Sequence, residues 1–198
     1  MRAKLFSLAL AALALGSTAA LAGWQDVASQ FDQGRLAHLA EAKQKGLAEA
    51  HGGTGSGDAS AIESALGPAS HAPSAAELTG AWRCRTIKLG GITPYVVYSW
   101  FRCRISSRDG GLFFEKLTGS QRTEGFLYPG EGGLVYLGAS SVTGEPSHAY
   151  SGSGASAGAP ATPDDQIGIL TVIAAGHARL EMPYPLQEST YDVIELKR

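Results

Sequence analysis

The chain has 198 residues, of which 16 are basic and 18 acidic, giving a formal net charge of −2. This length fits a single domain of ordinary size. Because the charges nearly balance, the chain as a whole has no attraction for nucleic acid, and binding to an anionic surface would require a local patch. The five histidines are scattered without ligand spacing and lie far from the two cysteines, so we expect no metal site and no cofactor.

Residues 1–22 have the pattern of a cleavable export signal. Arg2 and Lys4 form a basic start, residues 5–15 form an apolar run, and Ala20-Leu21-Ala22 is a small-residue cleavage site. The apolar run is shorter than the roughly 20 residues that a membrane-spanning helix needs. We therefore expect a periplasmic or secreted protein that is not integral to the membrane after cleavage.

Residues 23–77 are predicted to form a helical extension and a linker. Apolar side chains at helical spacing over residues 24–50 predict an amphipathic helix, interrupted near Gly34, that packs on the outside of the next domain. A shorter helix is predicted from Asp58, as N-cap, to about Leu66. A linker containing glycine and proline follows it.

Residues 78–198 alternate with a period of two and predict a mainly β domain. The expected strands lie at about 79–88, 95–105, 111–118, 121–128, 133–139, 166–174, 177–182 and 190–196. Eight sequential antiparallel strands with short connections can remove their edges by closing into an up-and-down, lipocalin-like barrel. A β-sandwich is the alternative architecture.

Two features resemble catalytic motifs without their context. The connection at about 140–165 is rich in Ser, Gly, Ala and Pro, which predicts a mobile low-complexity loop. Within it, Gly154-Ala155-Ser156-Ala157-Gly158 matches G-x-S-x-G but lacks the strand and helix that expose a nucleophile. His177 and Glu181 share a strand with no third group beside them. We therefore expect no enzyme.

The chain's two cysteines, Cys84 and Cys103, lie in the first two predicted strands, each between two arginines. A hairpin turning near Thr93-Pro94 would place them opposite each other, close to the separation that a disulfide needs. An oxidising compartment favours a bridge between such a pair.

The same hairpin would place Arg83 opposite Arg104 and Arg85 opposite Arg102 on its other face. Because like charges repel there, something has to offset them. One alternative is a salt-bridge network with carboxylates on neighbouring strands, for which the candidates are Glu115, Asp192 and Glu195. The other is an anion site, in which guanidinium groups bind a carboxylate, phosphate or lipid head group. Its candidate ligand-binding residues are Arg83, Arg85, Trp100, Arg102, Arg104 and Arg122.

Gly80-Ala81-Trp82 is the pattern with which lipocalin-like barrels open, the tryptophan plugging one end. The runs that carry a wider resemblance are Trp82-Arg83-Cys84-Arg85-Thr86-Ile87-Lys88-Leu89-Gly90, Trp100-Phe101-Arg102-Cys103-Arg104-Ile105, Lys116-Leu117-Thr118-Gly119-Ser120-Gln121-Arg122 and Asp192-Val193-Ile194-Glu195-Leu196. Over residues 80–196 the chain resembles the uncharacterised exported bacterial proteins grouped as domain of unknown function 4893 (DUF4893). The resemblance implies export and a common fold, and no particular chemistry.

Residues 73–82 resemble the stretch with which periplasmic inhibitors of secreted zinc metalloproteases enter their barrel. In those inhibitors the preceding residues insert into the protease, and residues 67–72 occupy that position here. The leading hypothesis is a noncatalytic barrel that binds a small anionic or amphiphilic, lipid-like ligand. The alternative is a protein-interaction module such as a metalloprotease inhibitor.

Overall fold

The computed structural model describes residues 23–52, 56–152 and 162–198. The predicted export signal and the G-x-S-x-G stretch lie outside the described residues, as does the centre of the predicted loop at 140–165. No helix in the described ranges is long and apolar enough to cross a membrane.

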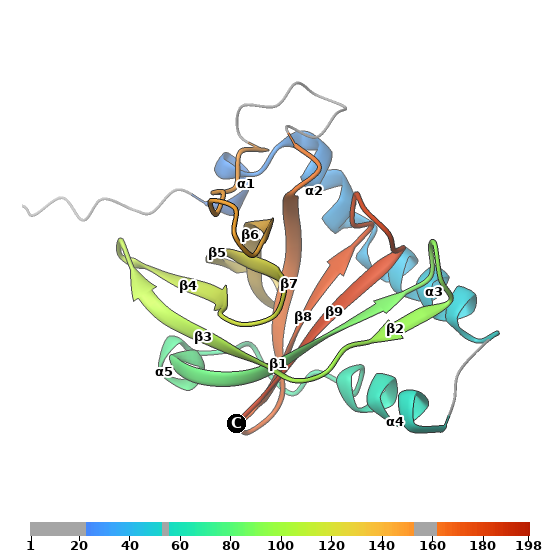
Figure 1. Cartoon of the computed structure of the whole chain (residues 1–198). Helices are drawn as coiled ribbons and strands as arrows, with labels where there is room; N and C mark the ends of the chain where they lie inside the picture. The colour runs from blue at the N-terminus through green and yellow to red at the C-terminus, as the bar shows by residue number, and fades with distance from the viewer. Residues whose placement is uncertain (1–22, 53–55, 153–161) are drawn as a thin grey trace, which may run out of the picture.

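Antiparallel strands form one sheet that closes on itself as a barrel (Figure 1). The strands are β1 (Gly80–Leu89), β2 (Tyr95–Val97), β3 (Phe101–Arg108), β4 (Gly111–Lys116), β5 (Gln121–Gly130), β6 (Gly133–Val142), β7 (Asp165–Ala174), β8 (His177–Pro183) and β9 (Tyr191–Lys197). Each strand pairs with the next, and β1 pairs with β9 to close the sheet. The eight-stranded antiparallel barrel is therefore confirmed, and the sandwich alternative is wrong.

The predicted strand 95–105 is divided into two strands along one edge of β1. β2 pairs with the C-terminal end of β1 and β3 with its N-terminal half. Residues 98–100 lie between them outside the ladder. The division gives the barrel one more strand than the sequence predicts.

Helices cover part of the outside of the barrel (Figure 1). They are α1 (Trp24–Val27), α2 (Gln30–Ala37), α3 (Leu39–Ala50), α4 (Ser56–Ala65) and α5 (Ala75–Leu78). The predicted break near Gly34 is wrong, because Gly34 lies inside α2. The chain instead breaks at Ser29, whose hydroxyl caps α2 by accepting from the Asp32 backbone N–H at 3.1 Å, and at His38. Asp58 is not an N-cap either, since α4 begins at Ser56.

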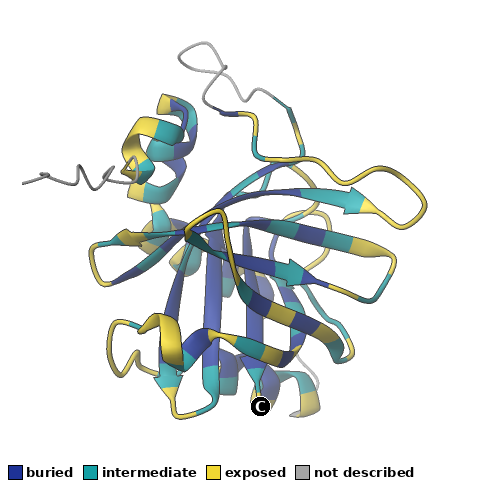
Figure 2. Ribbon diagram, turned by 90° about the vertical axis from the view of Figure 1, so that its left-hand side faces the viewer, coloured by how far each residue is buried: buried dark blue, intermediate teal, exposed yellow. Residues whose placement is uncertain are grey.

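Alternating side chains divide the sheet into an inner and an outer face, visible as alternating buried and exposed residues along several strands in Figure 2. Trp82 and Cys84 of β1 point into the main apolar core of the barrel. Ile87 and Leu89 lie on the outer face, yet they are buried because α3 and α4 pack over them. β1 is thus covered on both faces near its C-terminal end.

One end of the barrel is filled by Trp82. Its indole N–H donates to the carbonyl of Leu78 in α5 at 2.7 Å, and the Arg198 guanidinium lies 4.1 Å from the ring centroid. Gly80 has a φ of 130°, which other residues rarely adopt, and it brings the chain from α5 into β1. This arrangement matches what the Gly80-Ala81-Trp82 pattern predicts.

Cys84 and Cys103 form a disulfide inside the barrel, with Cα atoms 5.8 Å apart. The predicted hairpin register is wrong by two residues, because Cys84 faces Phe101 and Cys103 faces Trp82. The turn starts earlier than expected, at Gly90 and Gly91, both with positive φ. Since a shift of two keeps each side chain on its face, the cysteines remain diagonal neighbours close enough to bond.

The disulfide joins residues 19 apart in sequence. Replacing both cysteines with alanine (Cys84→Ala/Cys103→Ala) should lower the free energy of unfolding by about 3 kcal/mol, because the open chain gains loop entropy. Urea denaturation of the oxidised wild type and the double variant measures the difference. Reduced wild type should unfold near the variant, and equal stability of all three would contradict the prediction.

Candidate functional site

The barrel end opposite Trp82 is formed by the last residues of β1, β4, β6 and β8 and the first residues of β3, β5, β7 and β9. We call this end the mouth. A cavity of about 150 Å³ opens there, lined by inward side chains that include Lys88, Lys116 and Asp192. Deeper in the barrel, buried apolar side chains form one core cluster. The mouth is therefore where the polar part of the interior meets solvent.

Lys88 is held in the mouth by two carboxylates. β1–β9 pairing sets it directly opposite Asp192, and its ammonium forms an ion pair with Glu188 in the β8–β9 loop. Burial lowers the pKa of Lys88, but Glu188 and Asp192 outweigh this and raise it. Burial raises the pKa of Asp192 to about 6, although a hydrogen bond from Ser189 at 2.6 Å and the charge of Lys88 oppose the shift.

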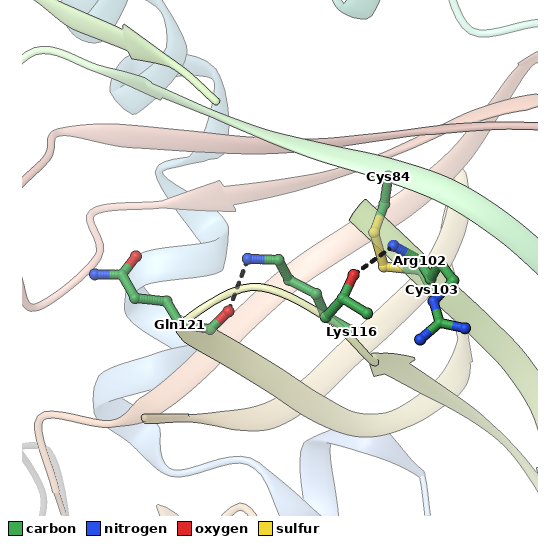
Figure 3. The surroundings of a disulfide bond; sticks show 6 residues. Cys84, Arg102, Cys103, Lys116 and Gln121 are labelled. Atoms are coloured by element: carbon green, nitrogen blue, oxygen red, sulfur yellow. Dashed lines mark hydrogen bonds between the residues drawn. A yellow bond between two sulfur atoms is a disulfide. The ribbon is translucent and has the colours of Figure 1, made fainter. Parts of the chain in front are cut away.

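Lys116 is buried in the same cavity with different neighbours. Its ammonium donates to the Gln121 carbonyl at 2.7 Å and lies 4.5 Å from the centroid of the Phe101 ring. The side chain extends away from the disulfide toward Gln121 (Figure 3). Among the described residues it forms no ion pair with a carboxylate. Burial, followed by repulsion from Arg122 and Lys88, lowers the pKa of Lys116 to about 8.

Arg122 lies at the rim of the cavity, where its Nε donates to the Thr143 hydroxyl at 3.2 Å. Acidic side chains line another part of the cavity, namely Glu145, Asp164 and Asp165. Asp164 accepts from Ser140, and Asp165 accepts from Ser151. Among the described residues, Lys88 pairs with Glu188, whereas Lys116 and Arg122, on β4 and β5, form no ion pair with a carboxylate.

The other arginines of the candidate set lie on the outer face of β1 and β3, which we call the outer wall. Arg85 donates to Glu195 at 2.6 Å. The fully buried Glu195 also lies 2.8 Å from His177 and 2.9 Å from Lys197. Burial opposes ionisation of Glu195, but hydrogen bonds from Lys197 and Arg85 outweigh it and lower its pKa.

A second carboxylate, that of Glu115, pairs with arginines at the other edge of the outer wall. Glu115 lies 2.9 Å from Arg104 and 3.6 Å from Arg108. Arg83 and Arg102 stand directly opposite each other on β1 and β3, both exposed. Within the described part of the chain neither forms an ion pair. Trp100 joins Arg83 to Arg85, which lie 5.0 and 4.7 Å from its ring centroid.

The structure therefore separates the six predicted ligand-binding residues, because Arg122 lies at the mouth and the other five lie at the outer wall. The salt-bridge alternative accounts for Arg85 and Arg104, with Glu195 and Glu115 as partners. Asp192 is wrong as a partner, because it points into the barrel. Sequence reasoning missed Lys88 and Lys116 as mouth residues. The available signal was parity, since Lys88 is four residues from Cys84 and so shares its inward face.

The linker before β1 is anchored to the barrel. The Ser70 backbone N–H donates to the Val172 carbonyl at 2.8 Å, and Arg179 donates to the Gly67 carbonyl. His71 forms an isolated bridge with Val172 and an ion pair with Glu77. In this position the linker runs along the barrel and does not project from it as a free arm.

The chain belongs to the family described as domain of unknown function (DUF4893), whose model matches residues 24–196. The match covers the helices as well as the barrel, so the helical extension is part of the family unit. Comparison with curated proteins and with solved structures found no match.

Glu195 and Glu115 form a matched pair for testing the outer wall. Replacing Glu195 with alanine should lower the free energy of unfolding by about 3 kcal/mol or more, because it leaves partly buried cations without their carboxylate. Glu115→Ala should cost less than about 1 kcal/mol, since Arg104 and Arg108 are largely exposed. Urea denaturation measures both values, and equal costs would show that Glu195 is not the organising carboxylate.

Asp192 makes stability depend on pH. Its pKa rises from an ordinary 3.8 to about 6 in the folded chain. Between those values the folded state binds more protons than the unfolded state, so stability should fall as pH rises, by about 3 kcal/mol in total. Asp192→Asn should remove this component. Unfolding free energies measured across pH 4 to 7 test it, and a constant difference between variant and wild type would contradict the raised pKa.

Proposed function

We propose that the protein is an exported, noncatalytic β-barrel module that binds a small anionic ligand in its mouth. The site consists of Lys116 and Arg122, with Lys88 beside them. The buried disulfide supports an oxidising, exported location. The proposal keeps a small anion as the ligand, leaves out the amphiphilic alternative, and moves the main site from the outer wall to the mouth of the barrel.

The environment of Lys116 carries the proposal. A buried ammonium is normally offset by a carboxylate, because desolvating an unpaired charge is costly. Lys116 instead lines a cavity together with two further cations, Lys88 and Arg122, whose repulsion lowers its pKa, and it forms no ion pair among the described residues. A bound anion would supply the missing negative charge and accept the remaining N–H donors of the ammonium.

The cavity size defines the ligand further. About 150 Å³ is below the roughly 300 Å³ of the smaller drug-sized pockets and similar to cavities that hold one benzene-sized molecule. An acyl chain entering the barrel would have to displace the side chains of the apolar core cluster below the cavity. The acidic side chains in the lining disfavour a polyanion. These features favour a phosphate or a small carboxylate over an amphiphile.

Replacing Lys116 with glutamine should weaken binding of inorganic phosphate or acetate at least tenfold, because the central cation is lost. Isothermal titration with each anion measures the change. The unfolding midpoint should stay the same or rise, since the substitution also removes a desolvated charge. Arg122→Gln should weaken binding less, because Arg122 lies at the rim.

Lys45→Gln is the matched control, since it removes one exposed positive charge from α3 that is not part of the cavity lining. It should leave anion binding unchanged. Wild-type protein that binds neither phosphate nor acetate, or Lys116→Gln protein that binds them as well as the wild type, would contradict the proposed site.

A further inference from the structure

A row of cations crosses three adjacent strands of the outer wall. In the β-sheet register Lys197 of β9 pairs with Arg83 of β1, and Arg83 pairs with Arg102 of β3. Paired positions point to the same face, so the three side chains stand side by side. With strands about 4.8 Å apart, the row spans roughly 10 Å. We call Lys197, Arg83 and Arg102 the cationic row.

The carboxylates of the wall do not neutralise this row. Glu195 pairs with Lys197, but it also serves Arg85 and His177. Glu115 serves Arg104 and Arg108 at the opposite edge. The two arginines of the row have no ion pair among the described residues. Basic side chains therefore outnumber carboxylates on this wall, although the whole chain is slightly acidic.

Trp100 helps to keep the cations together despite their repulsion. Its ring lies 5.0 Å from Arg83, 4.7 Å from Arg85 and 5.8 Å from Lys197, each measured to the centroid. Cation–π attraction of this kind offsets part of the repulsion between like charges. Trp100 therefore stabilises several cations close together on one surface. A wall with a purely structural role would not require this concentration of positive charge.

We propose that the cationic row is a docking surface for the head groups of an anionic lipid bilayer. Leu117, the residue after β4, lies beside the row, because its backbone N–H donates to the Arg102 carbonyl at 2.8 Å. Its exposed side chain adds an apolar contact. Basic residues gain favourable energy near an anionic bilayer surface without needing a pocket. The surface is independent of the mouth, because it uses the outer face of the sheet.

A bilayer fits this surface better than an acidic polypeptide does. The strands of the wall are paired on both sides in the closed sheet, so an extended peptide finds no free edge to join. The described cavity with inward-facing cations opens from the inner face of the sheet, whereas the row stands on the outer face. The row presents positive charge on an exposed face with one leucine beside it. This combination is complementary to the negatively charged head groups of a bilayer surface.

Co-sedimentation with vesicles tests the proposal on the chain that begins at Gly23, the predicted mature form. The wild type should bind phosphatidylglycerol vesicles, bind phosphatidylcholine vesicles much less, and lose binding as salt is raised. Arg102→Gln should weaken binding roughly fivefold, and Arg83→Gln/Arg102→Gln about 25-fold. Arg102→Lys should retain binding because it keeps the charge, and Lys45→Gln should match the wild type.

The unfolding midpoint and phosphate binding at the mouth should be unchanged in these arginine variants, which separates this surface from the mouth site. If the double variant does not fold, vesicle binding by Arg102→Gln and the salt dependence of wild-type binding still test the proposal. Equal binding to both kinds of vesicle, or wild-type binding by a folded Arg83→Gln/Arg102→Gln variant, would overturn the proposal. Binding to polyglutamate without binding to vesicles would overturn it in favour of an acidic polypeptide.

Discussion

β1 pairs with β9 over residues 83–89, and the polar and apolar surfaces of the barrel are arranged around this pairing. It closes the sheet and fixes which side chains meet on each face. Inside the barrel it sets Lys88 opposite Asp192, and outside it sets Arg85 opposite Glu195. Between these positions it assembles the buried outer patch onto which α3 and α4 pack. The polar mouth, the ion pairs of the wall and the attachment of the helices all follow from one register.

The two ends of the barrel differ in their physical character. At one end, Trp82 and the apolar core exclude water, and the disulfide joins β1 to β3 within that core. At the other end, buried charges are placed around a cavity that a tightly packed interior would not contain. Burying Lys116 and Asp192 lowers stability, because each loses solvation when charged. A polar end with this cost is more readily explained by a ligand than by folding.

Much of the fold could be predicted from the sequence, because the period-two alternation shows which residues face inward even when the pairing between strands is misjudged by two residues. The expected turn at Thr93-Pro94 was misplaced, since the two glycines before it start the turn. The pairing differs from the prediction by three residues between β1 and β2 and by two between β1 and β3. The shift of two changed the partners of the arginines but kept Cys84 and Cys103 on the inner face. The disulfide was therefore predictable, whereas the pairing of individual arginines was not.

The candidate site was less predictable, for a related reason. A lysine at a strand end ordinarily points its ammonium to solvent, and only the closed barrel places Lys88 and Lys116 around a common cavity. Their inward parity was visible in the sequence, but their proximity depends on strands far apart in the chain. The boundaries between α1, α2 and α3 were not predicted either. The apolar spacing over residues 24–50 is continuous, and it does not show that Ser29 caps a new helix within that stretch.

The ionisation of Lys116 shows whether an anion binds at the mouth. Nuclear magnetic resonance titration of its side chain, with selectively labelled lysine and Lys116→Gln for assignment, would follow the ammonium with and without phosphate. We expect a pKa of about 8 for Lys116 in the free protein and a rise toward the ordinary value near 10.4 when phosphate is bound. An ordinary pKa in the free protein, or a lowered pKa that phosphate leaves unchanged, would contradict an anion site at the mouth.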